Sequence, residues 1–286
     1  MIYLILSIFT SSIILVIFRK FKENNINTFQ AIVFNYVVAF SVGFLFFGKE
    51  WSNEMMGTGS WQPYALIIGT LFISLFLLMG KSAQENGIGV TSVTVKMSLV
   101  IPVIFAIWLF KEDVFLTKVV GIILALVGVF LITYQKKKGK KANAKNSLFL
   151  VILFLGSGVL DASINYVEKK ALGDLSPALF TAIGFGIAGL IGGIVLTIAV
   201  LFKKQKIKLR NVIGGVILGV PNFFSIYFLI MAIRQPLDDS ITYALNNVGI
   251  VLLSYLLGIL LFRESTSTIK IIGGLVAVTS IVLMSI

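Results

Sequence analysis

Ten long apolar runs constrain this chain more than any other feature of its sequence. They cover residues 2–18, 28–47, 63–80, 88–110, 114–134, 147–167, 177–202, 210–232, 239–262 and 268–285. A helix needs about 20 mostly apolar residues to cross the hydrocarbon core of a bilayer. The runs are continuous and do not alternate with polar residues, which excludes the strands of a membrane barrel. We therefore predict an all-α integral membrane protein with ten transmembrane helices.

The composition agrees with a chain whose main solvent is lipid. Hydrophobic residues make up 58% of the 286 residues and charged residues 13%, whereas soluble proteins are about 25% charged. The chain contains no Cys and no His. Their absence excludes disulfides, zinc sites built from Cys and His, haem and iron–sulfur ligation, and catalytic triads with an imidazole. We expect no cofactor and no metal.

The positive charges gather in alternate loops. Seventeen of the 24 Lys and Arg residues lie in the first, third, fifth, seventh and ninth loops, beginning with Arg19, Lys20 and Lys22. Loops rich in Lys and Arg usually stay in the cytoplasm, so the count predicts that both termini lie outside the cell membrane. A basic loop can also contact nucleic acid or anionic lipid. Topology is the simpler explanation for most of the net charge of +12, and we expect no nucleic-acid partner.

The two halves of the sequence resemble each other. Phe110-Lys111-Glu112 is followed 152 residues later by Phe262-Arg263-Glu264, and the four residues Lys118, Gly121, Ala125 and Leu131 recur as Lys270, Gly273, Ala277 and Leu283. Both copies lie where the fourth span of a five-span half meets the fifth. Because five is odd, the second half would enter the bilayer upside down. We predict five-helix repeats over residues 1–134 and 147–286, joined by a basic cytoplasmic linker at 135–146. Inverted repeats are typical of transporters, whose substrate site lies near the midplane between the halves.

These motifs resemble those of the drug/metabolite transporter superfamily, in its ten-helix EamA-type branch. The resemblance rests on the turns that end in Glu112 and Glu264, the final helices that contain Gly121 and Gly273, and Pro102 in the fourth span. It implies a secondary transporter of small organic metabolites such as amino acids, with export as the expected direction. We expect a monomer or a homodimer in the lipid bilayer. Members of this branch usually keep both termini in the cytoplasm, whereas the loop charges here predict the opposite.

Away from the ends of the predicted spans, two charged residues lie inside them, Lys96 in the fourth and Asp161 in the sixth. A charge at the bilayer centre costs about 2.5–3.5 kcal/mol on insertion scales. Lys96 could face a cavity and bind an anionic or zwitterionic substrate, or it could snorkel to the interface or form a structural ion pair. Asp161 could bind a substrate amine, pair with Lys96, or take up a coupling proton.

Amide and tyrosine side chains complete the set of candidate substrate-binding residues. They are Asn35, Tyr36, Asn165, Tyr166, Asn222, Tyr227, Tyr243, Asn246 and Asn247. An amide can serve a polar ligand as both donor and acceptor, and it can equally join two helices by a hydrogen bond. Pro221, directly before Asn222, predicts a kink that would expose backbone carbonyls.

The predicted function is transport of small organic metabolites by alternating access between the two halves. We do not expect an enzyme, because an intramembrane protease needs a pair of carboxylates or metal ligands. Two alternatives remain open. One is a membrane receptor or scaffold that transports nothing, and the other is multidrug efflux, which Lys96 disfavours for cationic drugs.

Overall fold

The structure is a computed structural model that describes the backbone of residues 1–51, 60–110, 115–133, 144–203, 205–233, 235, 239–264 and 267–285. Within these ranges the chain forms eleven α-helices and one short 3₁₀ turn. The helices are α1 (Ile2–Glu23), α2 (Thr28–Phe47), α3 (Trp61–Glu85), α4 (Ile88–Met97), α5 (Val100–Phe110), α6 (Leu116–Thr133), α7 (Ala144–Lys170), α8 (Pro177–Lys203), α9 (Leu209–Ile233), α10 (Asp239–Phe262) and α11 (Thr268–Ser285). The turn covers Gly48–Glu50.

The predicted all-helical membrane fold is confirmed. Seven stretches of the described residues are long and apolar enough to cross a membrane, and shorter apolar helices accompany them. Large apolar side chains such as Leu45, Leu190 and Phe202 are exposed on the outside of the bundle, where they contact the acyl chains of a bilayer. The chain is therefore a multi-pass membrane protein, and the predicted count of ten spans broadly agrees with the helices observed.

The predicted fourth span is not one helix but two, α4 and α5, separated by a turn at Ser98 and Leu99. Pro102 explains the break. Proline has no N–H to donate to the carbonyl of Ser98, and its ring crowds that carbonyl in a regular helix. The chain instead tightens at this point, where the Leu99 N–H donates to the Lys96 carbonyl (3.4 Å) and the Ile101 N–H to the Ser98 carbonyl (2.9 Å).

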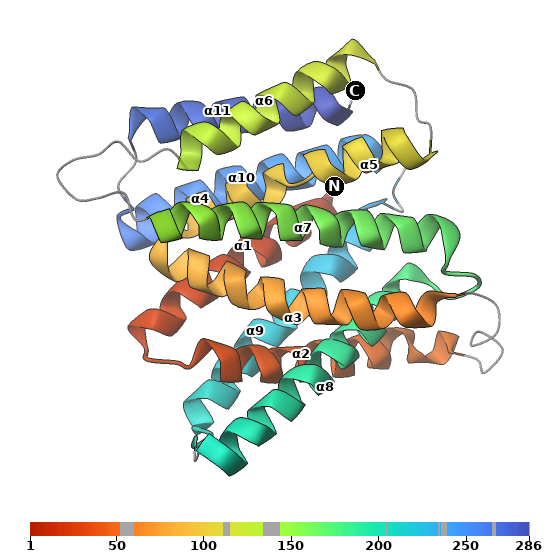
Figure 1. The fold of residues 1–286 in the computed structure, drawn as a ribbon, viewed down its shortest axis with the longest axis vertical. Coiled ribbons are helices and arrows are strands. Elements are labelled where there is room, and N and C mark those ends of the chain that lie inside the picture. The colour runs from red at the N-terminus through yellow and green to blue at the C-terminus, as the bar shows by residue number, and fades with distance from the viewer. Residues whose placement is uncertain are drawn as a thin grey trace.

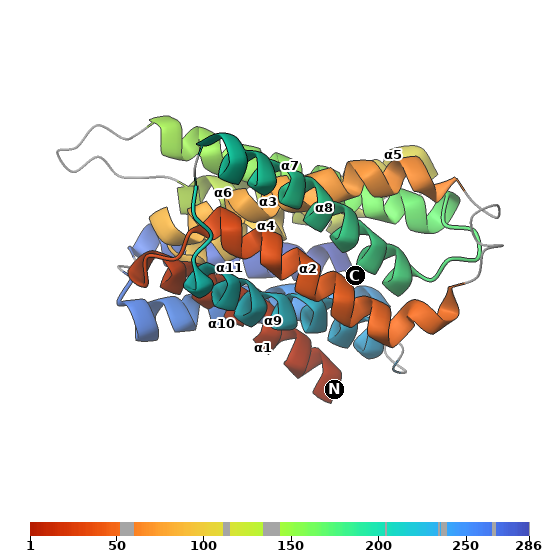
Figure 2. The same ribbon diagram turned by 90° about the horizontal axis from the view of Figure 1, so that it is seen from below.

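Helices from the two ends of the sequence interlock throughout the bundle. Helix α2 packs against α8 and α9, α3 packs against α7 and α8, and α6 packs against α11. Figure 1 shows α6 and α11 side by side along one edge. The connections from α1 to α2, α3 to α4, α8 to α9 and α10 to α11 share one end of the bundle, here termed the basic end, and both termini lie toward the other end (Figures 1 and 2). The division into two inverted repeats stays a prediction.

Glycines let α2 and α9 approach each other closely. A Cβ atom added at Gly215 would lie 2.6 Å from the backbone oxygen of Ala31, and one added at Gly219 would lie 2.8 Å from the backbone oxygen of Asn35. Such contacts with backbone atoms cannot be relieved by a rotamer change. Small residues have this role in many membrane helix pairs, because packing replaces the hydrophobic effect as the main attraction between helices in lipid.

We expect Gly215→Ala to lower the thermal stability of the detergent-solubilised protein, by about 1–3 kcal/mol, since overpacking forces the backbones apart. Gly193→Ala is the matched control, because a Cβ atom there meets no other atom within 4 Å. The control should be neutral or slightly stabilising, as alanine favours helix more than glycine does. Equal melting temperatures for Gly215→Ala and the wild type would show that the α2–α9 contact is not tight.

Candidate functional site

A cavity of about 190 Å³ lies among seven helices near the middle of the bundle. Helices α2, α3 and α4 contribute to its wall from the first half of the sequence, and α7, α8, α9 and α10 contribute from the second. We term it the central cavity. Its lining residues are Tyr36, Phe72, Leu75, Phe76, Met79, Val95, Lys96, Leu99, Leu153, Ser157, Leu160, Asp161, Phe185, Asn222, Ile226 and Asn247.

The two intramembrane charges named from the sequence, Lys96 and Asp161, both line the central cavity. Lys96 belongs to the last turn of α4, directly before the break. That position favours a cation, because the carbonyl end of a helix is the negative end of its dipole. No ion pair within 4.0 Å joins these two described side chains. The cavity therefore holds a cation and an anion that are both available to a ligand.

A second cavity, of about 150 Å³, adjoins the first. It shares Met79, Val95 and Lys96 with the central cavity and is otherwise lined by Ser11, Ile14, Leu15, Ser92, Ser225 and Ile250. Lys96 thus lies between two spaces. The hydroxyl of Ser92 is buried and has no hydrogen-bond partner among the described residues, so this second space also contains a polar group beside the lysine that a ligand could use.

Asn222 of α9 provides the clearest sign that a polar ligand belongs in the central cavity. Its side chain is buried, and its amide nitrogen has no hydrogen-bond partner in the part of the chain that the structure describes. A buried donor without an acceptor costs about 1–3 kcal/mol, and such groups in folded proteins usually have a reason. The preceding residue, Pro221, lies inside α9. A solute with an accepting oxygen would satisfy the amide.

Aromatic rings form one wall of the central cavity. Tyr36 is buried, and its hydroxyl donates to the backbone carbonyl of Phe72 at 2.7 Å. Its ring centre lies 5.5 Å from that of Phe76 and 5.6 Å from that of Phe185. Tyr36 therefore offers a ring face to the cavity, because its hydroxyl donor is already used. Sequence reasoning missed the three phenylalanines and Ser157, since nothing in an apolar run marks which of its members face a cavity.

Several candidates from the sequence do not line the central cavity. Asn35 and Asn246 are buried between helices, and each has side-chain atoms without a partner. Tyr227 belongs to an aromatic cluster with Phe46, Phe47, Phe223, Phe224 and Phe228. Asn165 and Tyr166 are half-buried on α7, where the Tyr166 ring lies 5.6 Å from that of Tyr64. The side chain of Tyr243 lies outside the described residues.

The repeated glycines of the sequence motif lie where α6 meets α11. The Ser280 hydroxyl donates to the Gly121 carbonyl at 2.8 Å. A Cβ atom at Gly128 would lie 3.3 Å from the Gly273 carbonyl oxygen. None of these residues lines the central cavity. Their small side chains are explained by the close packing of α6 against α11.

Glu264, the acid of the second motif, holds the start of α4. Its Oε1 accepts the backbone N–H of Ile88 at 2.8 Å, the first residue of that helix. A carboxylate suits this position, since the first N–H groups of a helix lack partners and form the positive end of its dipole. The contact joins the α10–α11 connection to the helix that bears Lys96. Glu112, its counterpart in the first motif, lies outside the described residues.

Comparisons with known proteins agree with this architecture. The profile of the EamA-like transporter family matches residues 1–134. An uncharacterized protein of Haemophilus influenzae is 30% identical over 285 residues, which cover 97% of this chain and 95% of that protein. The chain belongs to the EamA-like transporter family, whose members are membrane transporters of small molecules and not enzymes.

Other relatives have names that refer to a sugar. The probable glucose uptake protein GlcU of Bacillus anthracis is 26% identical over 271 residues, covering 89% of this chain and 84% of that protein. The glucose uptake protein GlcU of Bacillus subtilis is 27% identical over 213 residues, covering 71% of this chain and 69% of that protein. One crystal structure of a protein aligns with this chain at a TM-score of 0.63. The alignment covers 99% of this chain and 94% of the crystallised chain, with 13% sequence identity. At this level of identity the likeness shows the fold alone.

We expect Glu264→Ala to destabilise the protein by about 1–3 kcal/mol, because the buried N–H of Ile88 loses its acceptor. Glu264→Gln should retain most of the stability, since the amide oxygen can accept the same bond. Thermal unfolding in detergent measures both. Glu23→Ala is the control, as this exposed carboxylate pairs only with Lys20 and exposed pairs contribute little. Equal losses for the Ala and Gln variants would contradict the capping role.

Proposed function

We propose that this chain is a secondary transporter in the cytoplasmic membrane of a bacterium, and that the central cavity is its substrate site. The unpartnered amide of Asn222, in a cavity that also holds Lys96 and Asp161, is the observation that supports this most directly. Polar groups are expensive inside a membrane bundle, so a cavity that gathers three of them indicates a polar cargo.

The mechanism we propose is alternating access. Residues from both halves of the sequence line the cavity, so rocking of one half against the other would open it to each side in turn. Transporters often place the substrate beside a discontinuous helix, whose half-helix ends present free backbone groups and dipole charge. The α4–α5 break supplies such ends next to Lys96. Topology with both termini outside remains part of the proposal.

We propose a monosaccharide as the substrate. The rings of Tyr36, Phe76 and Phe185 offer flat apolar surfaces to the C–H faces of a sugar, while Asn222 and Asn247 offer hydrogen bonds to its hydroxyls. Lys96 and Asp161 add strong donors and acceptors, because hydrogen bonds to charged groups are worth about 1.5–3 kcal/mol. The names of the Bacillus relatives support the same class of solute and the uptake direction.

An amino acid is the second candidate, and one observation favours it. Lys96 and Asp161 line the same cavity, so they could bind the carboxylate and the amine of one zwitterion. This candidate is the substrate that the sequence suggested, with export as the direction. The two proposals differ in what they require of Asp161, because a sugar needs only a hydrogen-bonding group there, whereas an amine needs a negative charge.

The deciding experiment is counterflow into liposomes that contain the purified protein. A panel of labelled monosaccharides and amino acids is tested with and without a pH gradient. Saturable uptake of a hexose that protein-free liposomes lack supports the sugar proposal, and stimulation by the gradient indicates proton coupling. Uptake of amino acids alone overturns the sugar proposal. No flux for any solute, including cationic dyes as probes of drug efflux, favours a receptor or scaffold.

We expect Lys96→Ala to lower the initial rate of substrate flux at least tenfold, because the substrate loses a charged hydrogen-bond partner worth about 1.5–3 kcal/mol. Lys49→Ala is the charge-matched control, since Lys49 is an exposed cation far from the cavity lining. The melting temperature of each variant shows whether it is folded. Normal transport by Lys96→Ala would show that the lysine is structural and that the proposed site is wrong.

Asp161→Asn should separate the two substrate classes. Asparagine keeps an accepting oxygen, so transport of a monosaccharide should fall only a few-fold. Transport of an amino acid should be lost, because the amine would meet no negative charge. Counterflow with both classes of solute measures the two outcomes on one preparation. Loss of sugar transport equal to that of Lys96→Ala would show that the carboxylate charge itself is required, and would contradict a hydrogen-bonding role.

A further inference from the structure

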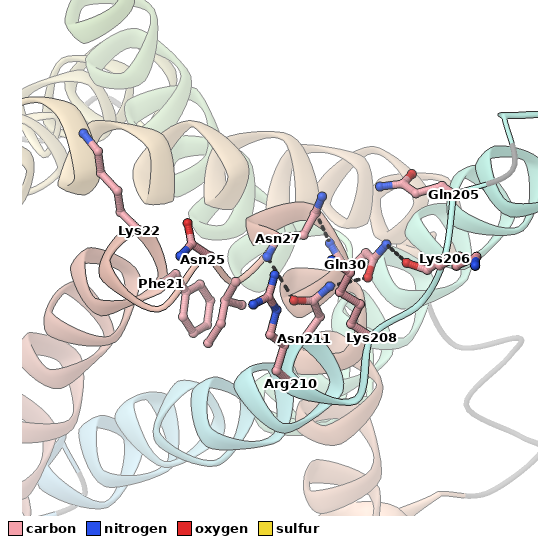
Figure 3. Close-up of a pocket in the computed structure, with 11 residues that line it drawn as sticks. Phe21, Lys22, Asn25, Asn27, Gln30, Gln205, Lys206, Lys208, Arg210 and Asn211 are labelled. Carbon is pink, nitrogen blue, oxygen red and sulfur yellow. Dashed lines mark hydrogen bonds between the residues drawn. The ribbon is translucent and has the colours of Figure 1, made fainter.

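A third pocket, larger than the two cavities described above, lies at the basic end of the bundle, far from the central cavity in the fold. It has a volume of about 510 Å³ and is formed by the α1–α2 connection and by the segment that joins α8 to α9. Figure 3 shows its lining residues. They are Phe21, Lys22, Asn25, Ile26, Asn27, Gln30, Gln205, Lys206, Lys208, Arg210 and Asn211. We term it the basic pocket.

Amide side chains build the floor of the basic pocket and satisfy one another. The Asn211 amide nitrogen donates to the Gln30 side-chain oxygen, and the Asn211 oxygen accepts the Asn27 backbone N–H at 3.0 Å. Gln30 also donates to the Lys206 carbonyl at 3.2 Å, which ties the α8–α9 segment to α2. Asn211 and Gln30 are buried. The floor is thus a closed hydrogen-bond network that needs no ligand to hold its shape.

The charged side chains around this floor are all positive. Lys22, Lys206, Lys208 and Arg210 line the pocket, and none of its described lining residues has a carboxylate. Glu23, the acidic neighbour of Lys22, is paired with Lys20 at 2.6 Å. Figure 3 shows the guanidinium of Arg210 directed toward Asn27. The Lys22 ammonium donates to the Gln84 carbonyl at 3.3 Å, which leaves Lys206, Lys208 and Arg210 to face an anion. Helices α2 and α9 begin here as well, so the positive ends of two helix dipoles add to these three cations.

The segment that bears these cations also shows where the pocket lies relative to the bilayer. Between residues 206 and 210 the cations alternate with apolar residues. Lys206, Lys208 and Arg210 line the pocket, while Ile207 and Leu209 are exposed and do not, with 73% of Leu209 accessible. Exposed apolar side chains that alternate with cations belong at the boundary between acyl chains and headgroups, where lysine and arginine meet lipid phosphates.

We propose that the basic pocket binds the phosphate group of an anionic phospholipid headgroup. Phosphate suits it, because lysine and arginine side chains together with helix N-termini are the groups that proteins use for phosphate. The site is shared between the two halves of the sequence, since Asn27 and Gln30 come from the first half and Lys206, Lys208 and Arg210 come from the second. A bound headgroup therefore favours the state in which these two connections lie together.

The test counts bound lipid by native mass spectrometry while phosphatidylglycerol or phosphatidylcholine is titrated into the full-length protein in detergent. Wild type should bind phosphatidylglycerol in preference to phosphatidylcholine. The double variant Lys208→Gln/Arg210→Gln should bind phosphatidylglycerol about 30-fold more weakly, which corresponds to about 1 kcal/mol for each cation removed near a membrane surface. The exchange variant Lys208→Arg/Arg210→Lys retains both charges and should bind within about threefold of wild type.

Lys81→Gln/Lys270→Gln is the matched control, because it removes two cations from the basic end but none from the pocket. An equal loss in this control would overturn the proposal and leave only a general attraction to the positive end. So would unchanged binding in the pocket variant. If millimolar inorganic phosphate or glycerol phosphate displaced the lipid, the pocket would be a site for a soluble phosphate, and the proposal of a lipid headgroup would be wrong. A melting temperature in phosphatidylcholine equal to wild type shows that the pocket variant is folded.

Discussion

The central constraint on this structure is that a backbone polar group cannot face lipid without a partner. The break between α4 and α5 interrupts the helical ladder in the middle of an apolar run, so it is tolerable only where protein or a cavity surrounds it. The chain meets this requirement locally as well. The Leu99 N–H donates to the backbone carbonyl of Lys96, and the Ser98 hydroxyl donates to the backbone carbonyl of Val95 at 2.6 Å. Because the break must be enclosed, helices from both halves gather around it, and that enclosure is the central cavity.

The same constraint explains why the start of α4 is held so firmly. Lys96 lies in the last turn of a helix of only 10 residues, and a helix this short has little stability of its own. Its first N–H is bonded to Glu264. Its first turn follows Gly87, whose φ of +94° an L side chain rarely adopts. Arg19 adds a further tie at this end by donating to the backbone oxygens of Ala83 and Gln84. Fixing one end of α4 fixes the depth at which the Lys96 ammonium enters the cavity.

The apolar runs were enough to predict an all-helical membrane fold, because bilayer thickness and helix rise leave few alternatives. The site was predictable only where lipid makes a residue costly. Lys96, Asp161 and Asn222 stood out for that reason, and all three line the central cavity. Asn35 has the same chemistry and yet lies between α2 and α9, because Gly215 and Gly219 bring those helices together around it. The sequence shows that an amide inside a span is costly in lipid, but it does not show which side of the helix meets a cavity. Nothing in the sequence identifies Phe72 or Ser157 as cavity-lining residues.

The positive charge of the chain has more than one physical role. The predicted topology accounts for its distribution along the sequence, since loops rich in Lys and Arg usually stay in the cytoplasm. That explanation places no demand on where the side chains lie within a loop. The alternation from Lys206 to Arg210 is a demand of that kind, because its three cations line the basic pocket whereas the exposed Ile207 and Leu209 do not. The same topology would result from Lys and Arg at any positions within this loop. The order found, with a hydrogen-bonded amide floor beneath the cations, fits a surface shaped to receive an anion at the membrane boundary. In the proposed topology both roles act through the same residues, because an end of the bundle that lysine and arginine hold in the cytoplasm would face the anionic leaflet.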